Sequence, residues 1–300
     1  AAYAFVTFYT SYLKKYYPSE FMSALLTLEK DNTDKVVKYV DEVKRLKLDL
    51  FPPDINKSDL VFSPTIIDGK EVVMFGMGAI KGAGDVAIKS ILESRKEDGD
   101  FKDLSDFLSR IDGSKVNKRV IESLTKAGAF DNFGYSRKSL LAQIEKIGDA
   151  VGDAMKMRKQ ATGSLFGDSD EMTRAEIELE HMDEFTAKEI LEFEKASLGF
   201  YVSGHPLDDY REQLDQIKYT LSSEIDELAD GSQALFVGKI ENIVEKISKK
   251  GNKFGIASIM DLHGNIELML FENRLKELEE DFDIEEPIAF KVRISKDENF

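Results

Sequence analysis

The chain has 300 residues, of which 42% are hydrophobic and 33% are charged, so it is long enough for two or more domains with cores of their own. Its formal net charge of −16 is unlike that of a dedicated DNA-coating domain, so any nucleic-acid contact must come from local basic patches. Cysteine is absent, which excludes disulfides and thiolate metal sites. No run approaches about 18 apolar residues. We therefore expect a cytoplasmic protein with no membrane partner.

The first part of the chain is expected to be helical and then to change to strands. In residues 2–47, aromatic and aliphatic residues recur at helical spacing, and Pro18 ends one helix and begins the next. The prolines of FPPDIN (Phe51–Asn56) interrupt this pattern. The following stretch, LVFSPTIIDGKEVVMF, predicts two short strands joined by a hairpin turn at Asp68 and Gly69.

A glycine-rich stretch, EVVMFGMGAIKGAGDVAIKSILESR, raises two competing interpretations. A dinucleotide-binding loop would need a second strand that ends in an acidic residue about 20 residues on, but here Asp103 falls on a helical pattern. The remaining functional interpretation is a helix-hairpin-helix, in which backbone N–H groups at the start of the second helix bind a DNA phosphate. The alternative is a glycine-capped connection that binds nothing.

An internal similarity favours the DNA interpretation. GAIKGAG at residues 78–84 recurs as GAFDNFG at residues 128–134, and the basic run SKVNKR lies between them. The second copy has Asp131 and Phe133 where the first has lysine and alanine, so we expect it to be a structural partner. The predicted DNA-binding residues are Lys81, Gly82, Gly84, Lys118 and Arg119.

The second half of the chain reads as a linker followed by a β domain. Residues 156–172 are polar and contain glycine, and residues 173–197 are predicted to form an acidic helix. From Gln233 onward, three alternating stretches, a helical stretch and a fourth alternating stretch follow one another. This is the order of a five-stranded OB barrel that lacks its last strand.

Several long motifs occur in a fixed order: AAYAFVTFYTSYLKKYYPSEFMSALLT, PPDIN, GMGAIKGAG, NKRVIESLTKAGAFD, SLGFYVSGHPLDDY and KKGNKFGIASIMDLHGNIELMLF. Together they resemble the alpha subunits of bacterial DNA polymerase III, the C family of replicative polymerases. The resemblance covers nearly the whole chain. It implies an excised segment of a longer enzyme, a DNA-directed DNA polymerase (a nucleotidyltransferase), that by itself is not catalytic.

The resemblance implies an α+β multidomain fold with four parts. Residues 1–75 would be the end of the fingers, 76–155 a tandem helix-hairpin-helix domain, 156–232 a helical linker, and 233–300 the incomplete OB domain. The family's catalytic carboxylates, which would hold Mg²⁺, lie in an upstream palm. We therefore expect no catalytic residue, metal site or cofactor in this segment.

The linker carries a second predicted contact, with the sliding clamp. The family binds the clamp through a short peptide that TGSLFG resembles, which assigns this role to Ser164, Leu165 and Phe166. Thr162 stands where glutamine is usual, which puts the polar anchor of the peptide in doubt. Two adjacent apolar residues could fill a pocket on the clamp, or could fold back onto their own domain.

A third predicted contact is with single-stranded template. In ISKKGNKFG, the loop between the first two OB strands, Lys249, Lys250 and Lys253 would contact phosphates and Phe254 would stack on a base. A solvated lysine turn with Phe254 in the barrel core is an equal alternative. The expected partners are therefore duplex DNA, the clamp, single-stranded DNA and other replicase subunits. A free-standing DNA-binding or scaffold protein is the main alternative to a polymerase segment.

Overall fold

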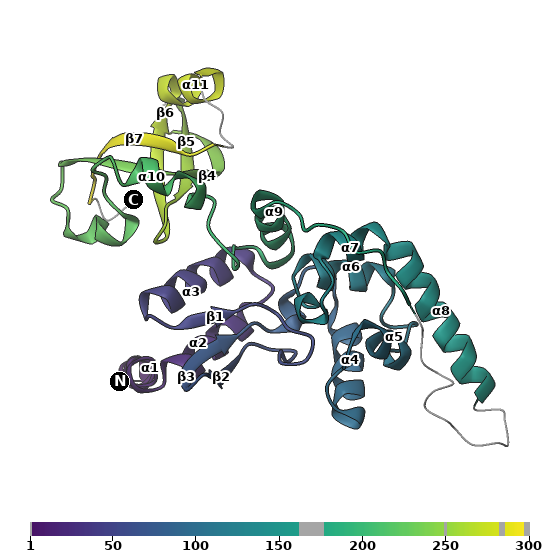
Figure 1. The fold of residues 1–300 in the computed structure, drawn as a ribbon. Coiled ribbons are helices and arrows are strands. Elements are labelled where there is room, and N and C mark those ends of the chain that lie inside the picture. Colours follow the sequence, from purple (N-terminus) through teal and green to yellow (C-terminus); the bar gives the residue numbers. More distant parts are fainter. Residues whose placement is uncertain (1, 162–176, 249–250, 282–285, 297–300) are drawn as a thin grey trace. The chain divides into compact units, whose positions relative to one another are not determined.

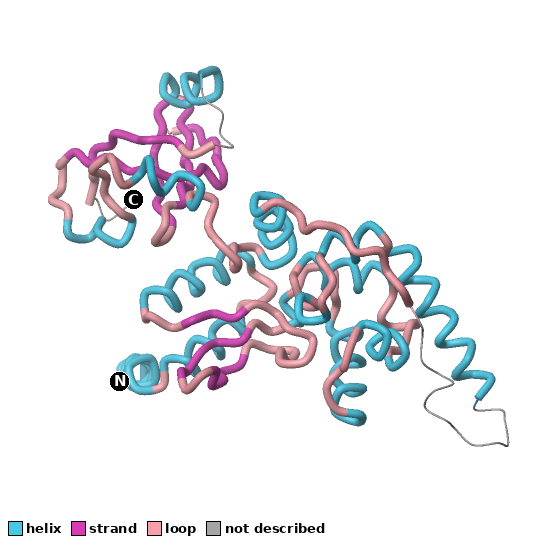
Figure 2. The backbone as a smooth tube through the Cα atoms, in the orientation of Figure 1, coloured by secondary structure: helices cyan, strands magenta, loops and turns pink. Residues whose placement is uncertain are grey.

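The computed structural model describes residues 2–161, 177–248, 251–281 and 286–296. The chain divides into two compact units, Ala1–Ser203 and Gly204–Phe300, which are described here one at a time. Helices dominate the first unit and strands the second, and each unit contains one sheet (Figures 1 and 2). The predicted α+β class is therefore confirmed, while the finer domain limits stay predictions. None of the helices in the described ranges combines the length and apolar character that crossing a bilayer needs.

The first unit opens with three helices and a small sheet. Their bounds are α1 Ala2–Tyr16, α2 Pro18–Leu28, α3 Thr33–Arg45, β1 Asp49–Phe51, β2 Ser63–Ile67 and β3 Lys70–Met74. The sheet has the order β1-β3-β2, with β1 parallel and β2 antiparallel to β3. Helix α2 packs on β2 and β3, and α3 packs beside β1. This arrangement places the end of β3 directly before the glycine-rich stretch.

The predicted boundaries in this region are largely confirmed. Pro18 is the first residue of α2, where its missing N–H costs nothing. Asp68 and Gly69 have φ values of 51° and 78°, as a two-residue hairpin turn requires. Strand β1 was not predicted, because three residues show no periodicity and their only strand partner, β3, comes later in the chain.

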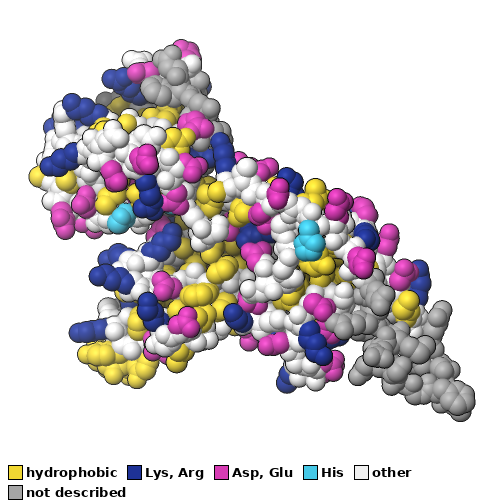
Figure 3. Space-filling model, viewed as in Figure 1, with side chains coloured by type: hydrophobic (Ala, Val, Ile, Leu, Met, Phe, Trp, Pro, Cys, Tyr) yellow, Lys and Arg dark blue, Asp and Glu magenta, His cyan; other side chains and the backbone are white. Residues whose placement is uncertain are grey.

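Helix α1 exposes an apolar face. Tyr3 is 90% exposed, and Phe5 and Phe8 are each 63% exposed. Hydrophobic side chains gather at this end of the unit in Figure 3. The spacing of apolar residues predicted this helix, but the described residues do not bury its apolar side.

Short helices make up the rest of the first unit. Their bounds are η1 Met77–Ala79, α4 Asp85–Asp98, α5 Leu104–Arg110, α6 Lys118–Lys126, η2 Asp131–Phe133, α7 Arg137–Ala142, α8 Ile144–Ala161 and α9 Ala187–Leu198. One continuous cluster of buried residues joins them to the sheet region, from Met22 to Phe200. Within it, Phe107 contacts Phe101 and Phe130 edge-on, with ring centroids 5.1 and 5.0 Å apart. This shared core fixes the two glycine loops on one body.

The acidic helix predicted for residues 173–197 is wrong over 177–186, which are extended. Ile177 and Leu179 are both buried, two residues apart, as in a strand. Side chains of α7 and α8 supply the hydrogen bonds that a helix would otherwise make: Gln143 accepts from the backbone N–H of Glu180, and Ser139 accepts from that of Met182. The charge pattern alone could not reveal these partners.

The second unit contains the β domain. Its elements are η4 Asp208–Tyr210, α10 Arg211–Leu214, η5 Ser222–Glu227, β4 Gln233–Ile247, β5 Lys253–Met260, β6 Asn265–Phe271, α11 Glu272–Asp281 and β7 Ile288–Arg293. The sheet is antiparallel with the order β6-β5-β4-β7, and its core includes Phe236, Ile259 and Leu275. The predicted order of three strands, a helix and a fourth strand is present. Strands β6 and β7 are the two edges of this sheet within the described residues.

Candidate nucleic-acid interface

The glycines of GMGAIKGAG have different structural causes. A Cβ on Gly76 would lie 2.4 Å from the carbonyl carbon of Val61, and one on Gly78 would lie 2.7 Å from the carbonyl oxygen of Leu60. These two glycines therefore let the chain pass close to residues 60–62, and they do not shape a dinucleotide loop. The element before the turn is the single 3-10 turn η1, where we expected an α-helix.

The second pair of glycines forms the turn itself. Gly82 and Gly84 have φ values of 89° and 69°, a region that L side chains rarely adopt. A Cβ on Gly82 would also lie 2.7 Å from the hydroxyl oxygen of Ser123 on α6, whereas Gly84 faces open space. Gly84 is the N-cap of α4 and brings no capping side chain. The start of α4 is therefore left to other acceptors.

Two backbone donors of this turn are unused. The N–H groups of Gly82 and Gly84 donate to no acceptor in the described part of the chain, while the N–H of Ala83 donates to the carbonyl of Ile80. The N–H of Lys81 donates to the carbonyl of Ser197 at the end of α9 (2.9 Å), so this amide is not available to a ligand. The Lys81 side chain is exposed. The turn thus offers two donors and one cation to an anion.

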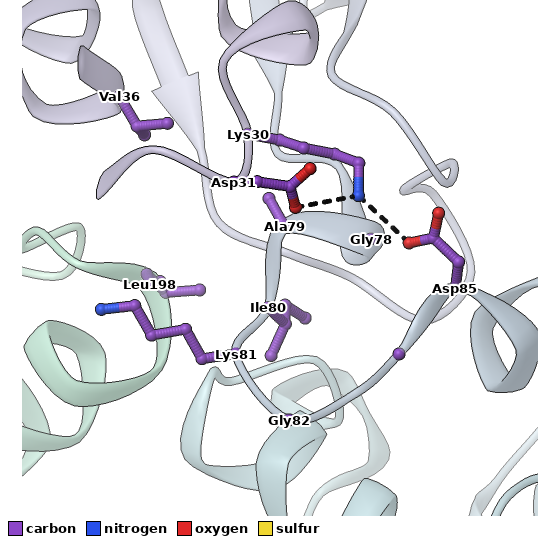
Figure 4. A pocket seen from close by; sticks show the side chains of 11 residues that line it. Lys30, Asp31, Val36, Gly78, Ala79, Ile80, Lys81, Gly82, Asp85 and Leu198 are labelled. Carbon is purple, nitrogen blue, oxygen red and sulfur yellow. Dashed lines mark hydrogen bonds and ion pairs between the residues drawn. The ribbon is translucent and has the colours of Figure 1, made fainter. Parts of the chain in front are cut away.

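A pocket of about 300 Å³ lies beside the turn, as Figure 4 shows. The ammonium of Lys30, from the turn between α2 and α3, lies 3.2 Å from Oδ1 of Asp85 and 3.4 Å from Oδ1 of Asp31. Burial alone would lower the pKa of Lys30, but the hydrogen bonds and charges of these two carboxylates outweigh it and raise that pKa. Lys30 was not singled out in the sequence, because its partner Asp85 is remote along the chain.

The second loop is filled by other parts of the protein. Asn132 donates to a carboxylate oxygen of Asp54 at 2.6 Å, and the N–H of Ile55 donates to the carbonyl of Ala129 at 3.0 Å. The PPDIN motif therefore fastens this loop. The two sequence copies also differ in backbone, because the first glycine of the pattern has positive φ only in the second copy, at Gly128 (83°).

A buried arginine ties the second loop to α9. The guanidinium of Arg137 donates to Asp131 (2.7 Å) and lies 3.5 Å from Glu194, whose side chain is 1% exposed. Burial disfavours the charged form, but the hydrogen bond and charge of Asp131, with the charge of Glu194, raise the pKa of Arg137. Glu194 also accepts from the N–H groups of Val202 and Ser203. This cluster holds the end of the first unit on the second hairpin.

The basic run before α6 is partly neutralised. Lys118 lies 2.5 Å from Glu145 of α8, and Lys115 lies 3.5 Å from Asp112. Arg119 is exposed on α6. Figure 3 shows basic and acidic side chains interspersed on the visible face. The structure does not place Lys118 and Arg119 in the pocket beside Lys81.

The predicted clamp-binding residues, Ser164, Leu165 and Phe166, lie outside the described residues. The chain on both sides is fastened to the first unit. Ala154 of α8 is buried before them, and Ile177 is buried after them.

In the second unit, the predicted single-strand contacts are only partly described. Lys249 and Lys250 lie outside the described residues, and the ammonium of Lys253 is 3.9 Å from Glu245. Phe254 is half-buried and faces away from the core, because Gly255, Ala257 and Ile259 take the buried positions of β5. The interpretation that places Phe254 in the barrel core is therefore wrong.

The face of the sheet that carries Phe254 contains further apolar side chains. Phe254 pairs with Lys246 on β4 and with Phe271 on β6, which is 68% exposed. In the next row of the same face, Val244 is 49% exposed. Phe271 was missed in the sequence, although the alternation of GNIELMLF assigns it to the outer face of β6.

No group of three or more His, Cys, Asp or Glu side chains that could hold a metal ion occurs among the described residues. The residues present therefore do not fit a Mg²⁺ site, and no chemical step can be assigned to them.

Comparisons with known proteins agree with this geometry. Residues 47–140 match the family described as a helix-hairpin-helix motif. The DNA polymerase III subunit alpha of Campylobacter jejuni is 44% identical over 93% of this chain, and that of Helicobacter pylori is 44% identical over 99%. That of Vibrio cholerae is 37% identical over 99% of the chain. The chain spans 23–26% of the length of these relatives. Over almost its full length, the chain therefore belongs to the family of bacterial DNA polymerase III alpha subunits.

Proposed function

We propose that this chain is the part of a replicative DNA polymerase that holds duplex DNA and the sliding clamp during template-directed synthesis. The relatives are named as subunits of a DNA polymerase, and the helix-hairpin-helix match covers the glycine loops. The catalytic palm and its Mg²⁺ would belong to the other three quarters of such a subunit. The cytoplasm, where a bacterial chromosome is copied, is the proposed location.

One observation supports duplex binding above all: the unused N–H groups of Gly82 and Gly84 beside the exposed Lys81. A phosphate oxygen can accept from both amides while the ammonium lies nearby. Such contacts read the backbone and carry no sequence information. On a body of net charge −16, we expect weak, salt-sensitive binding. Arg119 would add a contact at the flank, and Lys118 would first have to leave Glu145.

The test is duplex binding by the 300-residue chain as a function of salt. Lys81→Glu should weaken binding equally for all sequences and lower the slope of log affinity against log salt by about one. Lys70→Glu makes the same charge change on the exposed start of β3 and should change both quantities far less. Equal effects of the two variants would contradict a specific role for the loop.

The clamp contact is a proposal that rests on the LF pair of TGSLFG and on the fastened chain at its two ends. Adjacent leucine and phenylalanine side chains can anchor a short peptide in an apolar pocket. Leu165→Ala combined with Phe166→Ala should abolish clamp capture and leave duplex affinity unchanged. Undiminished capture, or a loss of folding in place of capture, would favour the interpretation in which the pair folds back on its own domain.

Contact with single-stranded template is proposed for the outer face of β4, β5 and β6. The half-buried Phe254 and the exposed Phe271 are adjacent across two strands, with Lys246 beside them. Aromatic side chains beside a cation suit stacked bases and their phosphates. Phe271→Ala should weaken binding of a single-stranded oligonucleotide by roughly 1–3 kcal/mol. Val244→Ala is the control for loss of apolar area without loss of a ring.

A further inference from the structure

The proposed phosphate site contains a carboxylate that should oppose it. Asp85 follows Gly84 directly and is the first residue of α4, and its side chain is 44% exposed. A carboxylate at this position stabilises the helix dipole. A phosphate bound to the amides of the same turn would occupy the same positive end of the helix. Without a counter-charge, the two anions would repel each other.

Lys30 supplies that counter-charge from a distant part of the chain. Its ammonium donates to Asp85 at 3.2 Å and to Asp31 at 3.4 Å, and its side chain is only 20% exposed. The raised pKa of Lys30, caused by both carboxylates against the opposing effect of burial, keeps the ammonium charged at neutral pH. Asp31 is 89% exposed, so solvent screens its charge more than that of Asp85.

Lys81 is not placed to perform the same task. In Figure 4 its side chain points toward Leu198 and away from Lys30 and Asp85. Its backbone N–H is fixed to the carbonyl of Ser197, which holds the start of the side chain in this direction. The two lysines therefore lie on different sides of the same loop, and one of them faces solvent.

We propose that Lys30 is a positioning residue for duplex binding, which neutralises and holds the Asp85 carboxylate so that the amides of Gly82 and Gly84 can accept a phosphate. This inference rests on the proposed function of the loop. It assigns the α2–α3 turn, in the part of the chain that resembles the polymerase fingers, a role in the adjacent hairpin. Lys30 acts through Asp85 and does not contact the DNA itself.

A double-mutant cycle on duplex affinity separates this role from a direct contact. Lys30→Met should weaken binding about fivefold, the effect of one uncompensated partly exposed charge near a phosphate. Asp85→Asn should bind at least as well as the unaltered chain. In the Asp85→Asn background, Lys30→Met should cost less than twofold, and Lys30→Arg should restore binding in the native background.

Other outcomes would overturn the inference. A fivefold loss from Lys30→Met in both backgrounds, with a salt slope lowered by about 0.9, would mean that Lys30 contacts a phosphate directly. A more than twofold weakening by Asp85→Asn would mean that the carboxylate supports binding. Asp85→Asn decides this even if Lys30→Met fails to fold, which thermal unfolding of each variant would reveal.

Lys81→Glu, measured in parallel, tests the loop itself. If it has no effect, the proposed function of the loop fails together with the inference. If it weakens binding while the Lys30 and Asp85 effects are simply additive, the loop binds DNA and only the role of Lys30 is wrong.

Discussion

In the loop of residues 78–84, the amides of Gly82 and Gly84 have no acceptor within the described residues, whereas the loop of residues 128–134 is held by side chains and backbone from elsewhere. The second loop lies against the PPDIN segment through Asp54 and against a buried arginine through Asp131. The first loop touches α6 at one glycine and opens onto a pocket. Both sit on one core.

The difference shows what turns a glycine loop into a binding site. Positive φ values occur in both loops, so conformation alone does not distinguish them. The distinction is whether the rest of the chain consumes the polar groups of the loop. Asp54, Ile55 and Arg137 do so for the second loop, which leaves it rigid and structural. The first loop keeps two donors for a ligand.

The largest effect should come from removing the arginine that fastens the second loop. Arg137→Met would leave Glu194, which is 1% exposed, as a buried charge without its partner. We expect a loss of roughly 3–5 kcal/mol in the free energy of unfolding, measured by urea denaturation. Arg119→Met removes an exposed arginine from α6 and should change stability by less than about 0.5 kcal/mol. Similar losses for both variants would contradict the structural role of the second loop.

Two glycines within the second loop should differ in the same way. A Cβ on Gly128 would lie 2.3 Å from the guanidinium of Arg137 and 2.9 Å from Asp131, in addition to the strain of φ 83°. Gly128→Ala should therefore destabilise by about 2–4 kcal/mol. Gly134 has φ 79° but faces open space, so Gly134→Ala should cost only about 1–2 kcal/mol. Thermal unfolding of the two variants measures the difference, and equal losses would mean that the arginine simply moves aside.

Local signals in the sequence predicted much of the fold. Pro18 and the Asp68-Gly69 turn set boundaries that the structure confirms, because each acts through its own backbone. Alternation of apolar residues gave the strand order of the second unit. Strand β1 and the extended residues 177–186 were missed, because their hydrogen-bond partners lie far along the chain.

The candidate site was predicted in outline and not in its electrostatics. Gly82, Gly84 and Lys81 lie together because they are neighbours in sequence. The pairing of Lys30 with Asp85 joins residues 55 positions apart, and no spacing rule predicts such a contact. The same holds for Phe271, whose position beside Phe254 depends on the register of two strands.

A matched pair of glycines tests the comparison directly in DNA binding. Gly84 and Gly134 have similar φ values, 69° and 79°, and both face open space. Alanine should strain the two backbones equally. Only Gly84→Ala should displace amides that bind a phosphate, so it should lower duplex affinity by about threefold to tenfold, measured by fluorescence anisotropy. If Gly134→Ala weakened binding as much, the two loops would not differ in the way the structure indicates.

The smallest expected effect concerns the turn that leads into α6 and so supports the second loop. The hydroxyl of Ser114 donates to Asp112 at 2.6 Å and its N–H donates at 3.0 Å, and these bonds lower the pKa of Asp112. The stability that this carboxylate contributes is therefore present above its ordinary pKa of about 3.9 and is lost as the pH falls through the lower folded value.

Ser114→Ala should cost less than about 0.5 kcal/mol at pH 7, because the turn is exposed to solvent. The difference from the unaltered chain should vanish near pH 2, about where both carboxyl groups are protonated. In an Asp112→Asn background, Ser114→Ala should show no pH dependence between these limits. A difference that grew as the pH fell would mean that Ser114 stabilises the protonated carboxyl, and the turn would then support α6 in a way that its hydrogen bonds do not explain.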